Sequence, residues 1–263
     1  MKIGASSACF YPLETEKALL KIARLGFTDA EIFFNSRCEL ERSFINELKA
    51  IRDFYGINIT SLHPYCSFSE GYNFFSRYER RFHDGAQEYK KLFEAAAILG
   101  APYIVLHGSR HKSDIPMELY AERYNALNEL AISCGCMIAH ENVVNYISES
   151  PQFMRDMKNL LGDSFRAVLD VKQARRTGID PQEFISALDS SIVHVHLSDY
   201  NAKCDCIPPD KKGFFDFEAL FTSLKAADYE GKYIVELYSD NFSDEAEISA
   251  SAKYLEDILN KIR

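Results

Sequence analysis

Short apolar runs typical of β-strands alternate with longer stretches of helical periodicity, and this alternation constrains the fold more than any other feature of the sequence. We interpret eight of these runs as strands: Lys2–Ser6, Ala30–Phe34, Asn58–His63, Tyr103–His107, Met137–Glu141, Phe165–Asp170, Ile192–Leu197 and Lys232–Glu236. Several, such as Ile104–Leu106, are apolar without alternation. Such runs are typical of parallel strands that are covered on both faces.

The stretches between the strands carry apolar stripes and capping signals of helices. Ser150 precedes Pro151, and Gly162 follows the expected end of that helix, as the positional preferences of these residues predict. Asp180 and Pro181 repeat the same start. We predict helices at Thr15–Leu25, Ser43–Tyr55, Tyr78–Leu99, Pro116–Cys134, Pro151–Leu161, from Asp180 onward, at Asp216–Ala227 and at Asp244–Ile262.

Eight strand–helix units in 263 residues give 263/8, or about 33 residues per unit, which is near the usual size in a (β/α)8 barrel. No linker or low-complexity segment interrupts the alternation. We therefore predict an α/β protein, a (β/α)8 TIM barrel that forms a single domain over residues 1–263. An open doubly wound sheet usually has a glycine-rich phosphate loop after its first strand, and Gly4–Ala8 is not one.

Composition and charge indicate which partners and which cellular location to expect for the chain. The 30 Lys and Arg against 39 Asp and Glu give a net charge of −9, which argues against non-specific nucleic-acid binding. No stretch approaches the roughly 20 apolar residues needed to span a bilayer, and the first residues are too weakly apolar for a signal peptide. The odd count of seven Cys favours reduced thiols. We expect a cytoplasmic protein with no membrane partner, and the sequence leaves a homo-oligomer open.

Ionisable residues end six consecutive strands, the third to the eighth. They are His63, His107, Glu141, Asp170, His196 and Glu236, each at or near the carboxyl end of its strand. In a barrel these ends converge on one rim, where catalysis takes place. Three carboxylates in one place repel each other strongly unless a cation is present. Each residue alone is typical of a loop cap or a buried polar side chain, and only the joint occurrence predicts a site.

Carboxylates and imidazoles are hard-to-borderline ligands. They suit Mn²⁺, Mg²⁺, Co²⁺ or Zn²⁺ better than soft metals. We therefore predict one divalent metal at the rim, with a second left open. Such a metal can act as a Lewis acid on substrate oxygens.

The strand-end motifs, in this order and spacing, resemble those of the xylose isomerase-like barrel superfamily. The resemblance is to its sugar-phosphate isomerase/epimerase group, which shares its fold with endonuclease IV, and it covers essentially the whole chain. It is carried by Thr60–Tyr65, Ile104–Gly108, Ala139–Asn142, Val168–Val171, Val193–Asp199, Ile234–Glu236 and the proline-containing loop 207–217.

The resemblance implies one metal held by Glu141, Asp170, His196 and Glu236, with Glu141 and Glu236 also serving as the catalytic acid/base pair. His63 and His107 match positions that hold an additional metal in the endonuclease and often touch substrate in the epimerases. We add Lys172, Gln173 and Arg110, which lie in predicted rim loops, as candidates for substrate binding or a second metal.

The chain departs from the endonuclease pattern in two places. Gln173 stands three residues after Asp170, where the family usually has a His, and the loop 203–207 lacks the Asp-x-His of the endonuclease. Cys206 is the one residue there that can replace the missing ligand. A three-zinc phosphodiesterase site is therefore disfavoured, and the charge of −9 argues in the same direction.

We therefore expect an enzyme of the isomerase class: a metal-dependent isomerase or epimerase of a sugar or sugar phosphate. One of Glu141 and Glu236 would remove the proton beside a metal-chelated carbonyl, and the other would return one. The alternatives are an endonuclease IV-like enzyme that cleaves abasic DNA, and a dehydratase of polyols or of a dehydroshikimate-type ring acid acting through the same site. A non-catalytic binding barrel is disfavoured because the full ligand set is retained.

Two further features concern the substrate. Basic residues in predicted rim loops either bind a substrate phosphate or are ordinary solvated charges: Arg37, Arg110, His111, Lys112, Lys172, Arg175 and Arg176. The segment Pro64–Arg77 is long enough to form a lid, although its aromatic residues can equally pack on the barrel or on a neighbouring subunit.

Overall fold

Parallel strands close into a barrel in the computed structural model, which describes residues 3–111, 115–210 and 212–262. Within these residues the barrel strands are β1 (Ile3–Ser6), β2 (Asp29–Phe33), β3 (Asn58–His63), β4 (Tyr103–Leu106), β5 (Met137–Glu141), β6 (Ala167–Asp170), β7 (Ile192–Leu197) and β10 (Lys232–Val235). Around the ring they pair in the order β1-β10-β7-β6-β5-β4-β3-β2. The predicted (β/α)8 barrel is confirmed, and Lys2, the predicted start of the first strand, lies outside the described residues.

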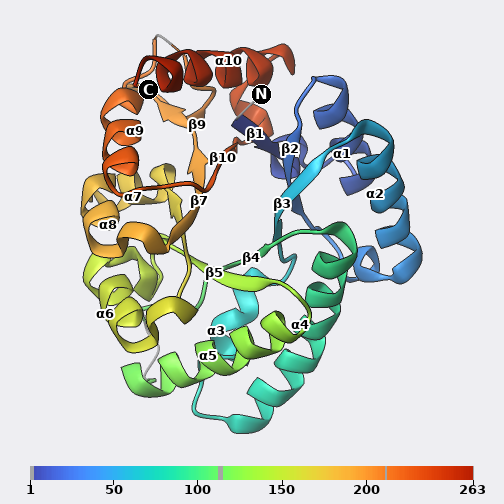
Figure 1. Ribbon diagram of the computed structural model, residues 1–263, viewed down its shortest axis with the longest axis vertical. Helices are drawn as coiled ribbons and strands as arrows, with labels where there is room; N and C mark the ends of the chain where they lie inside the picture. Colours follow the sequence, from blue (N-terminus) through green and yellow to red (C-terminus); the bar gives the residue numbers. More distant parts are fainter. Residues whose placement is uncertain (1–2, 112–114, 211, 263) are drawn as a thin grey trace.

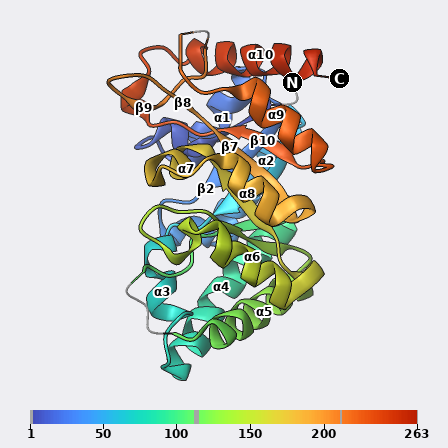
Figure 2. The same ribbon diagram turned by 90° about the vertical axis from the view of Figure 1, so that its left-hand side faces the viewer.

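Helices surround the barrel, as Figures 1 and 2 show. Those that follow the predicted alternation are α1 (Thr15–Arg24), α2 (Arg42–Tyr55), α4 (Glu79–Leu99), α5 (Met117–Ser133), α6 (Pro151–Leu161), α8 (Pro181–Leu188), α9 (Phe217–Ala226) and α10 (Ala246–Lys261). Elements that the sequence did not predict are α3 (Glu70–Asn73), α7 (Val171–Thr177) and an antiparallel hairpin of β8 (Asp199–Tyr200) and β9 (Asp205–Ile207). All of these additions follow the carboxyl ends of barrel strands.

Local signals explain where the predicted helices begin and end. The hydroxyl of Ser150 accepts a hydrogen bond from the backbone N–H of Phe153, and Pro151 occupies the first turn of α6. Gly56 ends α2 in the left-handed conformation, with a φ of 67°. A residue with a β-carbon adopts this conformation at a cost, which is why the glycine marks a helix end.

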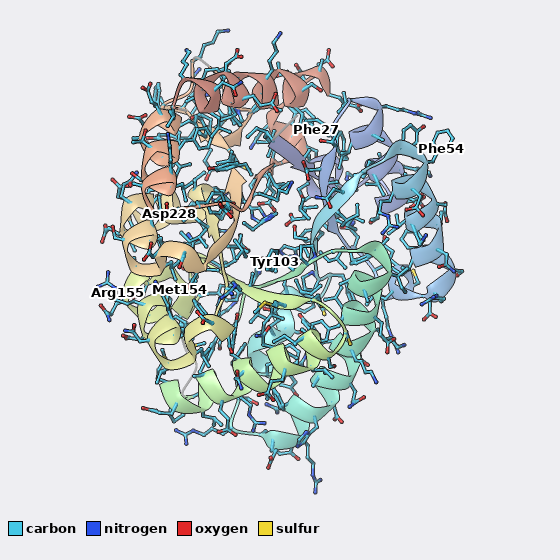
Figure 3. All side chains as sticks on the ribbon, viewed as in Figure 1. Phe27, Phe54, Tyr103, Met154, Arg155 and Asp228 are labelled. Atoms are coloured by element: carbon cyan, nitrogen blue, oxygen red, sulfur yellow. The ribbon has the colours of Figure 1, made fainter. Side chains whose placement is uncertain are left out.

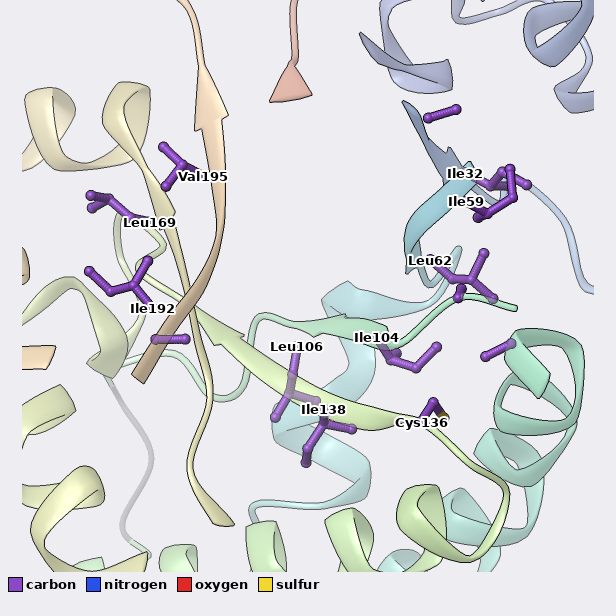
Figure 4. Packing of buried hydrophobic residues seen from close by; sticks show 14 of the residues in the cluster. Ile32, Ile59, Leu62, Ile104, Leu106, Cys136, Ile138, Leu169, Ile192 and Val195 are labelled. Carbon is purple, nitrogen blue, oxygen red and sulfur yellow. The ribbon is translucent and has the colours of Figure 1, made fainter. Parts of the chain in front are cut away.

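The main hydrophobic core lies between the outer face of the barrel and the helices. Figure 4 shows its side chains, which include Leu62, Ile104, Leu106, Ile138 and Leu169. Successive side chains of a strand point to opposite faces. The residues between these outward-facing ones therefore point into the barrel.

A small apolar layer fills the inside of the barrel. It consists of Val105, Ala139 and Val168, with Tyr103 and Val193 packed against it. Figure 3 shows Tyr103 near the centre of the ring, in contrast to the exposed Phe54 on α2. Two residues beyond Val105, Ala139 and Val168 stand His107, Glu141 and Asp170. Strand periodicity thus places these ionisable groups directly above the apolar layer, at the carboxyl ends of the strands.

The segment Pro64–Arg77 packs partly on the barrel. Phe74 and Phe75 are buried, and the ring of Phe75 stacks on Tyr120 with centroids 3.7 Å apart, whereas Phe68 is exposed. Glu70 fixes the segment to the end of β4, because its carboxylate accepts a hydrogen bond from the backbone N–H of Gly108. In the part of the chain described, none of the helices has the length and hydropathy required to cross a bilayer.

Candidate metal centre

Six strand-end groups meet at the carboxyl end of the barrel. His63, Glu141 and Asp170 are the last residues of β3, β5 and β6, and His196 precedes the last residue of β7. His107 and Glu236 follow β4 and β10 directly. Contacts between their side chains link all six, through two groups that share Glu141.

The first group consists of Glu141, Asp170, His196 and Glu236. One ligand atom from each lies within 4.8 Å of those of the other three. Nδ1 of His196 is the common neighbour: it lies 3.4 Å from Oε1 of Glu141, 3.4 Å from Oε2 of Glu236 and 3.9 Å from Oδ2 of Asp170. The four side chains that the resemblance assigns to one metal are therefore close enough to share one ion.

The charges in this group fit a divalent cation. Oε2 of Glu141 and Oδ2 of Asp170 are buried, and each lies beside a basic side chain: Oε2 is 2.9 Å from Nε2 of His107, and Oδ2 is 3.2 Å from Nζ of Lys172. Burial raises the pKa of Asp170 to about 7, and Glu141 and Glu236 act in the same direction. Burial also acts to raise the pKa of Glu141, but His107 and His196 outweigh it and hold that pKa well below its ordinary range. Buried carboxylate oxygens beside an imidazole nitrogen are a donor set suited to Mn²⁺, Mg²⁺, Co²⁺ or Zn²⁺.

Two cationic side chains balance the carboxylates in this structure. Burial acts to lower the pKa of His196, but Glu31 and Glu236 outweigh it and hold this pKa well above its usual value. Nζ of Lys172 lies 3.2 Å from Oδ2 of Asp170 and 3.2 Å from Oε2 of Glu236. The sequence predicts Lys172 in a rim loop, whereas the structure places its ammonium group between two carboxylates of the first group.

Helix α7 explains the position of Lys172. Asp170 is the N-cap of this helix, and its Oδ1 accepts a hydrogen bond from the backbone N–H of Gln173, 3.1 Å away. This hydrogen bond turns Oδ2 toward the group, and the first turn of the helix carries the side chain of Lys172 over it. One carboxylate thus both starts a helix and contributes to the site.

The second group consists of His63, His107 and Glu141. Nε2 of His107 lies 2.8 Å from Nε2 of His63 and 2.9 Å from Oε2 of Glu141. Burial and the neighbouring His107 lower the pKa of His63 to about 4. The two histidines thus contact the first group through Glu141, on the side toward β3 and β4.

Other candidates from the sequence lie outside both groups. The carboxamide oxygen of Gln173 accepts a hydrogen bond from the backbone of Val144, and the guanidinium group of Arg110 lies over the ring of Tyr146. The thiol of Cys206 is 3.5 Å from the carbonyl oxygen of Glu236 and belongs to neither group.

Several basic residues of the rim have acidic partners. Arg175 and Arg176 contact Asp205, and His111 contacts Glu149. Lys112 lies outside the described residues.

Glu31 and His194 are site residues that the strand-end pattern does not predict. Both are fully buried inside the barrel. The carboxylate of Glu31 contacts the imidazole of His194 and that of His196. Glu31 lies in the middle of β2 rather than at its end, so the strand-end pattern did not include it. The available signal was an acidic residue flanked by apolar ones within a strand, since an unpaired buried carboxylate is costly.

The sequence matches a known family model and is similar to known proteins. A family model described as xylose isomerase-like TIM barrel matches residues 19–258. An uncharacterised protein of Methanocaldococcus jannaschii is 25% identical, and the match covers 100% of this chain and 92% of that protein. A 3-dehydro-D-guloside 4-epimerase of Escherichia coli is 24% identical, with 90% of this chain and 92% of that protein covered.

A solved structure described as a D-tagatose 3-epimerase-like protein has the same fold. Its TM-score is 0.79 at 23% identity, and the match covers 100% of this chain and 98% of that one.

Proposed function

The chain belongs to the xylose isomerase-like TIM barrel family, and on that premise we propose that it is a divalent-metal-dependent epimerase of a sugar or sugar derivative. The observation that carries this proposal is the convergence of Glu141, Asp170, His196 and Glu236 on one buried point. The names of two similar proteins, a 3-dehydro-D-guloside 4-epimerase and a D-tagatose 3-epimerase-like protein, support the substrate class.

Each of the four residues has a proposed role. Asp170 and His196 hold the ion, together with Glu141 and Glu236. When bound, the ion acts as a Lewis acid on the substrate carbonyl and makes the neighbouring C–H more acidic. Glu141 and Glu236 are then the two groups that can move the proton at that carbon.

The strand order of the barrel supports the roles proposed for Glu141 and Glu236. β5 and β10, which place Glu141 and Glu236, are separated in the ring by β6 and β7. Their carboxylates therefore reach the same point from different directions. In an epimerisation, one removes the proton from one face of the carbon and the other delivers a proton to the opposite face, so the configuration inverts.

Substrate recognition would use groups around this pair. His63 and His107 lie beside Glu141 and are suited to hydrogen bonds with substrate hydroxyls. Lys172 donates to Glu236 and is suited to the same role. Three basic residues of the rim, His111, Arg175 and Arg176, already contact acidic side chains. These contacts favour an unphosphorylated substrate.

Proton exchange in D₂O tests the proposal. The purified protein is incubated with Mn²⁺ or Co²⁺ and a panel of ketoses and keto-glycosides, and NMR detects deuterium at the carbon beside the carbonyl. We expect deuterium together with the epimer. Glu236→Gln and Glu141→Gln should slow exchange by about 100-fold or more. Glu122→Gln, on the exposed side of α5, is the matched control and should have no effect.

Three results would contradict the proposal. The first is that the metal-loaded protein exchanges no proton in any substrate of the panel, the second that it releases water from a polyol or ring acid, and the third that it cleaves abasic DNA. The second result would indicate a dehydratase, and the third an endonuclease.

A further inference from the structure

A buried carboxylate lies on the side of His196 that faces away from the other three residues of the first group. Glu31, in the middle of β2, is fully buried, and its two oxygens lie within hydrogen-bond distance of four donors. These are Oγ of Ser6 at 3.0 Å, Oγ of Ser61 at 2.7 Å, Nε2 of His194 at 3.2 Å and Nε2 of His196 at 3.0 Å. The donors come from β1, β3 and β7, so the carboxylate links three strands across the inside of the barrel.

The two ring nitrogens of His196 have different neighbours. Nε2 faces Glu31, and Nδ1 faces Glu141 and Glu236. An imidazole that binds a metal through one nitrogen keeps its proton on the other, and the acceptor at that second nitrogen decides which is which. Because a carboxylate accepts from Nε2, that nitrogen keeps its proton when a metal replaces the proton on Nδ1, and the lone pair of Nδ1 is then directed at the other three residues.

Glu31, His194 and His196 are also close enough to hold an ion of their own. The hydrogen bonds argue against this alternative. Oε2 of Glu31 already has Ser61, His194 and His196 as donors, and Oε1 has Ser6. Each carboxylate oxygen offers about two lone-pair positions, so the three donors leave none for a cation on Oε2, the oxygen that faces both imidazoles.

From this geometry we propose that Glu31 is a positioning residue, which holds His196 as the Nε2–H tautomer so that Nδ1 binds the metal. The inference rests on the metal site of the proposed function, and it assigns a role to a residue that contacts neither the metal nor the substrate. His194 and Ser61 support this role, because their hydrogen bonds to Oε2 fix the orientation of the carboxylate.

Metal affinity measured on purified variants tests the proposal. Glu31→Met keeps a side chain of similar length but removes the acceptor, and we expect Mn²⁺ to bind about 10- to 100-fold more weakly. Glu31→Gln retains one oxygen acceptor and should recover part of the loss. Asp29→Asn is the matched control: it removes another buried carboxylate from β2, one that pairs with Asn58 and Lys232 instead, and it should leave Mn²⁺ affinity unchanged.

A double-mutant cycle separates positioning from a general loss of stability. In a His196→Ala background, Glu31→Met should weaken Mn²⁺ binding no further, because the residue through which Glu31 acts is gone. If Glu31→Met weakens binding equally in both backgrounds, or does not weaken it in the wild-type background, the proposal is overturned.

NMR of the unmutated protein gives an answer that does not depend on how well a variant folds. In ¹⁵N-labelled protein loaded with diamagnetic Zn²⁺, the ring of His196 should show a protonated Nε2 and a metal-bound Nδ1. Metal binding through Nε2 would overturn the inference alone. Failure of the unmutated protein to bind any divalent metal would overturn both the inference and the metal site of the proposed function.

Discussion

Lys172 provides a quantitative test of how the charges of the metal centre are balanced. Its ammonium group lies 3.2 Å from one carboxylate oxygen of Asp170 and 3.2 Å from one of Glu236, and its side chain is only 5% exposed. At this separation Coulomb's law gives about 1.3 kcal/mol per pair in bulk water and about 5 kcal/mol at an effective dielectric constant of about 20. The substitution Lys172→Met removes this charge and keeps most of the apolar side chain.

Removing one partner of a buried ion pair typically costs about 3–5 kcal/mol. We expect about 3 kcal/mol, because burial raises the pKa of Asp170 to about 7 and its protonation relieves part of the repulsion. An unfolding entropy of about 2.1 cal/mol/K per residue gives about 0.55 kcal/mol/K for 263 residues. The Tm of the metal-free variant should therefore fall by about 5 °C.

Saturating Mn²⁺ should remove most of this difference, because the ion supplies the positive charge that the ammonium group supplied. Mn²⁺ should accordingly raise the Tm of Lys172→Met more than that of the wild type, and bind the variant more tightly. Calorimetric unfolding with and without metal measures both effects. Equal losses of Tm in the two conditions, or no loss in either, would show that the ammonium group of Lys172 and the metal do not neutralise the same carboxylates. Lys232→Met is the control: its ammonium pairs with Asp29, its side chain is 46% exposed, and its effect should be small and independent of metal.

Two further predictions concern residues beside the centre. Gly108→Ala should destabilise the protein by about 2–4 kcal/mol in urea unfolding, because Gly108 has a φ of 81° and a new β-carbon would lie 2.2 Å from Oη of Tyr120; an unchanged midpoint would contradict this. Burial lowers the pKa of His140 to about 4, so the unfolded state binds more protons than the folded state between about pH 6.5 and pH 4. The free energy of unfolding should fall as the pH falls through this window, and it should fall less steeply in His140→Gln. Equal slopes of unfolding free energy against pH in the two proteins would show that His140 is not the group responsible.

Strand ends could be predicted from the sequence where an apolar run stops at a polar group. Asn58–His63, Met137–Glu141 and Ile192–Leu197 were predicted with the bounds that the structure has. The helix Pro151–Leu161 was predicted equally well, because a capping hydroxyl, a proline and a glycine mark its two ends. In these elements the local signals and the tertiary structure agree.

The parts that escaped prediction have tertiary causes. The helix Val171–Thr177 has no long apolar stripe, and its N-cap, Asp170, is a residue that the sequence pattern had already assigned to a metal. The ammonium group of Lys172 is buried because it pairs with the carboxylates of Asp170 and Glu236, which are far apart in sequence. Glu31 escaped because its partners lie on three other strands and become neighbours only when the barrel closes.

Glu141, Asp170, His196 and Glu236 are proposed to bind one divalent ion. Anomalous diffraction from crystals grown with Mn²⁺ would locate such an ion. We predict one strong peak about 2.0–2.3 Å from a carboxylate oxygen of each acid and from Nδ1 of His196. A crystal without a peak at this position, or with its peak held by other residues, would show that these four side chains do not form the metal site.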